Sequence, residues 1–225
     1  MMKKLLKNYT YSAVMPILAL CYSTLTFSFV KLLQIGRTHW DMSLPADAAV
    51  PFLPWTVTIY LGSFVYWYLC FLFASRGDRA ESDRLFATHF LTATVSALVF
   101  VLFPTTLQRP DIAGGGLWNW LMRVVYWFDT PENLFPSLHC STGWLCWVGL
   151  RRRRDLPLWT RLAALLLSLA VCVSTLTTRQ HVLADVFSGV ALCEIDYFLA
   201  SLPRVRGFFS RLFNSIEHRV YRWVE

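Results

Sequence analysis

Charged side chains are scarce in this sequence of 225 residues. Only 16% of the residues are Asp, Glu, Lys or Arg, whereas 56% are hydrophobic and 16% are aromatic. A soluble domain carries about 25% charged residues, so this chain has too few to cover a surface that faces water. The composition excludes an ordinary cytosolic enzyme and a disordered chain. It indicates a polytopic membrane protein.

Paired cysteines, basic stripes and repeats are also missing. The six cysteines all fall within apolar stretches and show neither disulfide nor zinc-ligand spacing, so they are expected to act as small buried hydrophobic residues. The net charge of +7 does not form the basic stripe of a nucleic-acid-binding protein, and no nucleic-acid partner is expected. Without an internal repeat or a low-complexity tract, the chain predicts one domain over residues 1–225.

The sequence instead contains long runs of apolar residues. A helix that crosses a bilayer needs about 20 such residues. Six segments approach this length: Tyr11–Leu33, Trp55–Ala74, Phe86–Phe103, Ser137–Leu150, Pro157–Leu176 and Val182–Leu202. The fourth is short, so that either it begins earlier, near Pro131, or its outer end lies below the membrane surface. We therefore predict an all-α fold, a bundle of six transmembrane helices whose first span is retained and not cleaved as a signal peptide.

The basic residues predict the orientation of this bundle. When the sides alternate at each span, five of the 21 Lys and Arg fall on one side: Lys31, Arg37, Arg109, Arg123 and Arg179. The other side holds the remaining sixteen and is therefore cytoplasmic, together with both termini. Two amphipathic interfacial helices are expected, one at residues 203–225 on the cytoplasmic side and one at Leu117–Phe128 on the outer side. Compact loops and no organellar signal favour a bacterial inner membrane.

Polar residues gather at the outer ends of the later spans. Ser137 and His139 open the fourth predicted span, and His181 and Asp185 open the sixth. A spacing of four places His181 and Asp185 on one helix face, and buried ionisable residues in membrane helices indicate function. Both spans present their N-termini on the outer side, where free N–H groups and the helix dipole favour an anion such as phosphate.

Two arginines lie in the same outer connections. Arg109 precedes the fourth span, and Arg179 lies two residues before His181. The guanidinium fork matches the oxygens of a phosphate group, and Ser137 adds a hydroxyl group. A phosphate bound between two imidazoles predicts a phosphoryl-transfer site.

Three motifs carry these residues: Phe103-Pro104-Thr105…Arg109-Pro110, Pro136-Ser137-Leu138-His139 and Ser174…His181-x-x-x-Asp185. In order and in loop placement they resemble the signature of the type 2 phosphatidic acid phosphatase superfamily. That signature reads Lys-x6-Arg-Pro, Pro-Ser-Gly-His and Ser-Arg-x5-His-x3-Asp. The resemblance includes the six-span layout and covers roughly residues 86–200.

The resemblance implies a phosphoryl transfer through a phosphohistidine, with no metal and no cofactor. His181 would be the nucleophile, and Asp185 would hold its imidazole in the reactive tautomer. His139 would protonate the leaving oxygen and then activate the incoming water. Arg109 and Ser137 would bind the phosphoryl oxygens as charge builds up in the transition state.

The signature is relaxed at three positions. Leu102 stands where the family has its lysine, Thr175 where it has its second arginine, and Leu138 where it has glycine. We expect Arg179 to take over one of the missing phosphate contacts. Similar relaxed signatures occur in the branch that contains inositol phosphorylceramide and sphingomyelin synthases, whose members pass the phosphoryl headgroup to an alcohol.

Three functions remain open at this point. The first is a membrane lipid phosphatase on the non-cytoplasmic face, acting on phosphatidate, phosphatidylglycerophosphate or a polyprenyl (di)phosphate. The second is a lipid phosphotransferase with the same chemistry and an alcohol as acceptor. The third is a transporter, scramblase or membrane adaptor without turnover. The complete set of His139, His181 and Asp185 favours the two enzymes.

Overall fold

The computed structural model describes the backbone of residues 2–224 and the side chains of residues 11–220. Over that range it contains eight α-helices: α1 (Met2–Leu33), α2 (Val57–Ala74), α3 (Arg79–Leu102), α4 (Leu117–Phe128), α5 (Leu138–Leu150), α6 (Leu158–Thr177), α7 (Leu183–Leu199) and α8 (Pro203–Val224). The connections add two short 3-10 helices, η1 (Pro45–Ala49) and η2 (Pro54–Thr56), and two short strands, β1 (Trp40–Asp41) and β2 (Thr105–Thr106). The predicted all-α class is confirmed.

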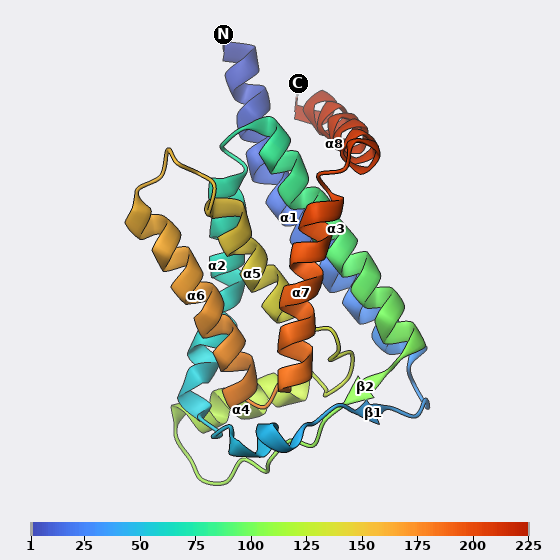
Figure 1. Cartoon of the computed structure of the whole chain (residues 1–225), viewed down its shortest axis with the longest axis vertical. Coiled ribbons are helices and arrows are strands. Elements are labelled where there is room, and N and C mark those ends of the chain that lie inside the picture. The colour runs from blue at the N-terminus through green and yellow to red at the C-terminus, as the bar shows by residue number, and fades with distance from the viewer. Residues whose placement is uncertain (1, 225) are drawn as a thin grey trace.

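Six helices form the bundle. Helices α1, α2, α3, α5, α6 and α7 run up and down beside one another, and the two remaining helices lie across its ends (Figure 1). Helix α4 crosses one end, called the α4 end below, together with the β1–β2 pair. Helix α8 crosses the opposite end, called the α8 end, where the chain also begins and finishes (Figure 1).

Four helical segments within the described residues are long and apolar enough to cross a membrane. They are Tyr11–Leu33, Pro54–Ala74, Arg79–Leu102 and Leu158–Thr177. The other two predicted spans correspond to α5, with 13 residues, and α7, with 17 residues. At 1.5 Å per residue these helices are only about 20 and 26 Å long, whereas the hydrocarbon core is about 30 Å thick.

The start of α5 decides between the two interpretations of the short fourth segment. Helix α5 begins at Leu138, with Ser137 as its N-cap, and the residues before it follow an irregular path that includes a cis peptide bond between Phe135 and Pro136. The helix therefore does not extend back to Pro131.

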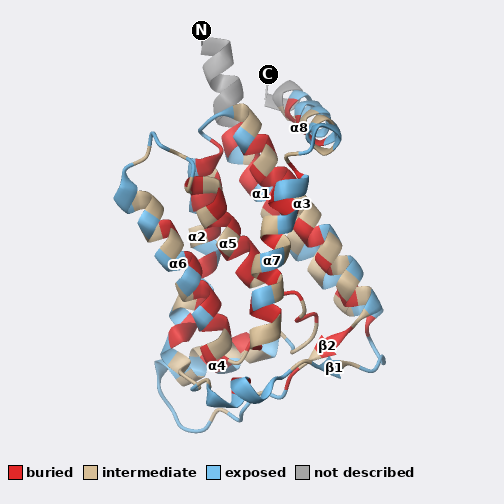
Figure 2. Ribbon diagram, viewed as in Figure 1, coloured by how far each residue is buried: buried red, intermediate tan, exposed pale blue. Residues whose placement is uncertain are grey.

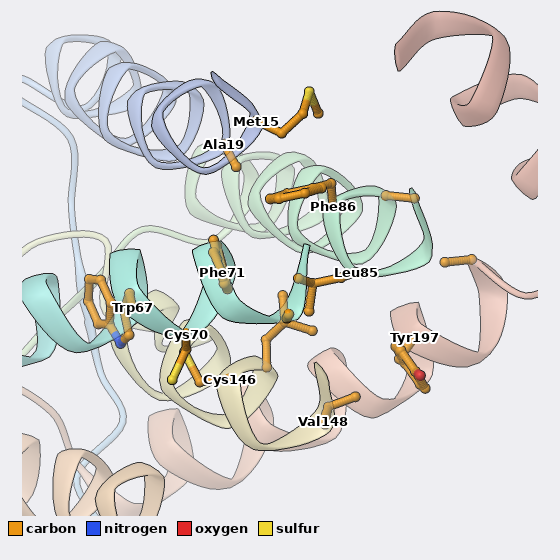
Figure 3. Packing of buried hydrophobic residues seen from close by; sticks show 14 of the residues in the cluster. Met15, Ala19, Trp67, Cys70, Phe71, Leu85, Phe86, Cys146, Val148 and Tyr197 are labelled. Atoms are coloured by element: carbon orange, nitrogen blue, oxygen red, sulfur yellow. The ribbon is translucent and has the colours of Figure 1, made fainter. Parts of the chain in front are cut away.

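The bundle is held together by an apolar core between α1, α2, α3, α5 and α7. Figure 3 shows Phe71 of α2 and Phe86 of α3 facing each other, with Cys146 of α5 close by. The rings of Phe71 and Phe86 meet edge to face at 5.9 Å. Such close packing of apolar groups is the main stabilising contribution within the bundle.

Large apolar side chains also cover much of the outer surface. Several of them lie along α6 and α7: Leu166, Leu169, Val173, Phe187, Ile195 and Phe198. The outward faces of these helices are exposed in Figure 2. An exposed apolar surface of this extent is typical of a protein that contacts lipid, and the apolar helices indicate a membrane protein.

Helix α8 is amphipathic and docks on the bundle with its apolar face. Phe213 is completely buried and its ring contacts Phe86 of α3. Beside it, Glu217 forms an ion pair with Arg79, 2.9 Å between Oε2 and Nη1. The predicted C-terminal helix is therefore present, and part of its apolar surface is used for packing against α3.

Candidate active site

Irregular segments wrap the α4 end of the bundle and hold one another in place. The hydroxyl oxygen of Thr105 in β2 accepts hydrogen bonds from the backbone N–H groups of Leu134 and Phe135, at 3.1 and 3.0 Å. Asp47 in η1 accepts the N–H of Leu183 at 2.8 Å and so caps the start of α7. The connections thus fix the two helix N-termini that carry the predicted site.

The N-termini of α5 and α7 are in direct contact. The Ser137 N–H donates to the backbone oxygen of Asp185 at 3.1 Å. This approach requires glycine on α7, because a Cβ atom at position 189 would clash with the carbonyl oxygen of Ser137. As a result, the predicted motifs around residues 136–139 and 181–185, some 45 residues apart in the chain, form one unit.

His181 and Asp185 are in contact, but His181 lies in the turn before α7 and not on the helix face that their spacing predicted. His181 Nδ1 lies 3.2 Å from Asp185 Oδ2, which also accepts the N–H of Val182 at 3.0 Å. Both side chains are buried. Burial alone would lower the pKa of the His181 imidazole, but the hydrogen bond and the charge of Asp185 outweigh it, so that the pKa is raised above its usual value. With Nδ1 engaged, Nε2 is the nitrogen left for chemistry.

His139 lies on the facing helix α5. The centroids of the His139 and His181 rings are 6.1 Å apart. Aromatic side chains of α2 surround His139: Tyr60 stacks on it at 4.4 Å, and Phe64 and Trp67 meet it edge to face. Within the part of the chain that the structure describes, the buried His139 Nε2 has no hydrogen-bond partner, so this nitrogen is free for a ligand.

Arg109 lies at the same end of the bundle, and the acceptors of its hydrogen bonds are neutral oxygens. It donates to the backbone oxygen of Asp129 and to Oε1 of Gln180, and its guanidinium group lies 4.5 Å from the centre of the Tyr126 ring. Burial lowers the pKa of Arg109 more than the neighbouring Asp129 charge raises it. Its buried Nε has no partner among residues 11–220. A half-buried cation held by neutral oxygens is a good receptor for an anion.

Ser137 and Arg179 are placed next to these groups, but each already has a structural role. The Ser137 hydroxyl oxygen accepts the Cys140 N–H at 3.2 Å as the N-cap of α5. Arg179 donates to the backbone oxygens of Asp47 and Val50 at 2.9 and 2.6 Å. It thereby joins the α6–α7 turn to the α1–α2 connection. Their contacts with phosphate stay predictions.

Two neutral residues, Leu102 and Thr175, stand where the family's cations are expected. Leu102 ends α3 and is 79% exposed. Thr175 is completely buried, and its hydroxyl group donates to the backbone oxygen of Cys172 at 2.8 Å. Its carbonyl oxygen accepts the N–H of Gln180 and of His181. Thr175 therefore shapes the backbone of the α6–α7 turn.

Comparison with protein families finds a match, and it covers the part of the chain that carries the two histidines. Residues 117–199 match the PAP2 superfamily. The match runs from α4 to α7, called the PAP2 segment below, and it confirms the resemblance that the motifs predicted. The PAP2 segment includes Ser137, His139, His181 and Asp185, whereas Arg109 precedes it. No curated protein and no solved structure matches the chain.

The PAP2 match supports a coarse statement of activity. Superfamily members are in general phosphoric ester hydrolases, so the match suggests an activity of the phosphatase or phosphotransferase type. The described side chains contain no group of three or more His, Cys, Asp or Glu residues placed to hold a metal ion.

The structure also shows three residues at the site to which the sequence analysis gave no role there. They are Asp47, Tyr60 and Gln180. Tyr60 donates its hydroxyl hydrogen to Asp129 Oδ2 at 3.0 Å, and Gln180 Nε2 is buried without a partner among the described residues. The position of Gln180 between Arg179 and His181 was the one available signal. The others come from α2 or from outer connections, with no motif around them.

A separate pocket of about 320 Å³ lies at the α8 end. It is lined by Arg76, Gly77, Asp78, Glu81, Gly149, Arg152, Arg153 and Asp155. Acidic and basic side chains are balanced there and no histidine lines it. The α4 end, with its facing histidines, is therefore the better candidate for the active site.

Proposed function

We propose that the protein is an integral membrane enzyme that cleaves the phosphate ester or diphosphate of a membrane lipid through a phosphohistidine on His181. The substrates we propose are phosphatidate, phosphatidylglycerophosphate or a polyprenyl diphosphate. The lipid tail enters sideways from the bilayer, which suits a bundle whose outer surface is apolar.

One observation carries this proposal. A histidine whose Nδ1 is engaged by a buried carboxylate faces a second histidine, 6.1 Å away between ring centroids, whose Nε2 is free. This arrangement supports the roles proposed for His181 as the nucleophile, Asp185 as its orienting group and His139 as the acid–base partner on the opposite side. Arg109, held by neutral oxygens at the same end, supplies positive charge for the phosphoryl group.

The reaction has two steps. In the first, the lone pair of His181 Nε2 attacks phosphorus, a P–N bond forms, and the bond between phosphorus and the lipid oxygen breaks as His139 gives that oxygen a proton. In the second step His139 takes a proton from water, the water oxygen attacks phosphorus, and the P–N bond breaks. Inorganic phosphate leaves and both imidazoles return to their starting states. Arg109 and Ser137 bind the phosphoryl oxygens in both steps.

We propose the six-span arrangement for the membrane, with α5 and α7 as the two short spans. Both termini lie in the cytoplasm and the α4 end lies on the outer side, in a bacterial inner membrane. Support comes from the sixteen basic residues assigned to the cytoplasmic side, against five on the other. The termini also lie at the α8 end, opposite to α4 (Figure 1).

A lipid phosphotransferase is the second candidate. The observation that favours it is the apolar neighbourhood of His139, which is enclosed by Tyr60, Phe64 and Trp67. An aromatic wall disfavours free water next to the group that activates the acceptor, whereas a lipid alcohol can pack against it. In that case the second step transfers the phosphoryl headgroup to a hydroxyl oxygen in place of water.

The test is phosphate release from a panel of phospholipid and polyprenyl phosphates in detergent, with EDTA present. We expect the purified protein to release phosphate and His181→Ala to lose at least about a thousandfold in rate, because it removes the nucleophile. His218→Ala is the matched control, since His218 is exposed on α8, and it should keep full activity.

Other outcomes of the panel separate the candidates. Transfer of the headgroup to an added lipid alcohol, without release of phosphate, would identify the transferase. Full activity of His181→Ala would show that the nucleophile is assigned wrongly. Neither release nor transfer on the whole panel, with a folded protein, would favour a membrane protein without turnover.

A further inference from the structure

A phosphate group that binds at the α4 end brings negative charge, which cations at this end can stabilise. Five cations lie in the last turn of α1, in the connections at this end, and in α4: Lys31, Arg37, Arg109, Arg123 and Arg179. Three of them donate hydrogen bonds to backbone oxygens alone: Arg37 to Val101, Arg123 to Ile112 and Gly114, and Arg179 to Asp47 and Val50. Arg109 and Lys31 remain.

Lys31 lies in the last turn of α1 and points toward the irregular segment that follows α4. Its Nζ atom is 3.7 Å from Asp129 Oδ1 and 5.3 Å from the centre of the Phe27 ring. The Lys31 and Asp129 side chains are 19% and 30% exposed. An ion pair this long and this accessible to solvent is weak, so the ammonium group can leave it easily.

Asp129 connects Lys31 to the catalytic groups. Its other carboxylate oxygen accepts the hydroxyl hydrogen of Tyr60, whose ring stacks on His139. Its backbone oxygen accepts a hydrogen bond from Arg109. Lys31, Arg109 and the partner of His139 thus converge on one residue. Within the described part of the chain, the Lys31 ammonium group is the member of this cluster that makes no hydrogen bond.

We propose that Lys31 is the second phosphate-binding cation of the site, acting with Arg109. In the absence of phosphate, Asp129 holds the ammonium group in place. When the phosphate dianion binds, the flexible Lys31 side chain exchanges the carboxylate for a phosphoryl oxygen, and the Tyr60 hydroxyl group continues to hold Asp129. The proposal rests on the proposed function, because it assigns a binding group to that same site.

The first test measures the binding of inorganic phosphate by calorimetry in detergent, in a His181→Ala background that cannot turn over. Lys31→Met should weaken phosphate binding by about 10- to 100-fold, the range of a hydrogen bond between charged groups. Lys31→Arg should stay within about threefold. The matched control is Arg123→Met, a cation on α4 bonded to carbonyl oxygens, which should leave the affinity unchanged.

Asp129→Asn distinguishes phosphate binding from a merely structural ion pair. The amide oxygen still accepts the Tyr60 hydrogen, while the negative charge is lost and Lys31 is released. We therefore expect phosphate to bind several-fold more tightly, the opposite direction from Lys31→Met. A structural ion pair predicts weaker binding in both variants, and that result would overturn the proposal.

The remaining outcomes separate this proposal from the proposed function. Phosphate binding that is absent, or equal in the Lys31→Met and Arg123→Met proteins, overturns the role of Lys31 even when the wild type cleaves lipids. Phosphate binding that depends on Lys31, in a protein whose wild type neither releases nor transfers phosphate, supports the binding site and rejects the catalytic activity.

Discussion

Asp185 affects His181 in two ways, through its negative charge and through the orientation that it gives the imidazole ring. It lies four residues further along the chain and engages Nδ1 through Oδ2, and the same oxygen accepts the Val182 N–H. The carboxylate is therefore fixed relative to the backbone that carries His181. Because the contact is local, the spacing of four residues indicated the pair, although His181 lies before the start of α7 and not on a shared helix face.

Replacing Asp185 by Asn should change both the rate and the pH profile. A nucleophilic imidazole has to be neutral, so cleavage should increase as the pH rises through the pKa of His181, which Asp185 raises above its usual value. In Asp185→Asn the effect of burial remains and the charge is lost, so that this acidic limb should move to lower pH. The maximal rate should fall about 10²- to 10⁴-fold because the tautomer is no longer held.

The measurement is the initial rate of cleavage between pH 4 and 9 for both proteins. A fall in rate with an unchanged acidic limb would mean that the limb reports another group. A limb that moves to higher pH would contradict the assigned role of Asp185.

At the scale of helices, the site depends on one close approach. Helix α7 meets the start of α5 at Gly189, where a side chain would strike the Ser137 carbonyl oxygen. The Ser137 N–H bonds to Asp185 in the adjacent turn. The distance between the two histidines is thus controlled by the packing of two helix backbones.

Gly189→Ala should therefore reduce both stability and activity. The added methyl group has to move the Pro136–Ser137 turn or α7, at a cost of about 1–3 kcal/mol, and it separates His139 from His181. Gly62→Ala on α2 is the matched control, because nothing lies within 4 Å of the added Cβ there, and it should be neutral or slightly stabilising. The measurements are the thermal unfolding temperature and the cleavage rate of both variants. Equal stability and equal activity of Gly189→Ala and Gly62→Ala would contradict the role of the close approach.

Sequence patterns predicted the helices better than the contacts between them. The bounds expected for α4, Leu117–Phe128, are those of the structure, since the aromatic amphipathic stretch begins after three glycines and ends before Asp129. The pairing of Tyr60 with Asp129, which are 69 residues apart, left no such signal. Which face of α2 meets His139 depends on how the helices pack, and a single sequence does not encode that in any local pattern.

At the scale of the whole molecule, the proposed orientation makes the two ends of the bundle chemically distinguishable from outside the cell. Asp111 is exposed in the connection before α4, and Asp155 is exposed between α5 and α6 at the opposite end. In a Cys21→Ser background, which removes the exposed native thiol, a membrane-impermeant maleimide should label Asp111→Cys in intact cells. It should label Asp155→Cys only after permeabilisation. The reverse pattern would place the histidines on the cytoplasmic side.

The short length of α5 and α7 has a consequence for the surrounding bilayer. In the proposed arrangement, α5, which carries His139, and α7, which begins just after His181, are about 20 and 26 Å long. The segments Tyr11–Leu33, Pro54–Ala74, Arg79–Leu102 and Leu158–Thr177 are long and apolar enough to cross a hydrocarbon core. The membrane around the site then experiences hydrophobic mismatch and thins on that side of the bundle. A lipid that diffuses into this region carries its headgroup closer to the bilayer midplane. The protein thereby brings the substrate down to the histidines without having to lift it out of the membrane.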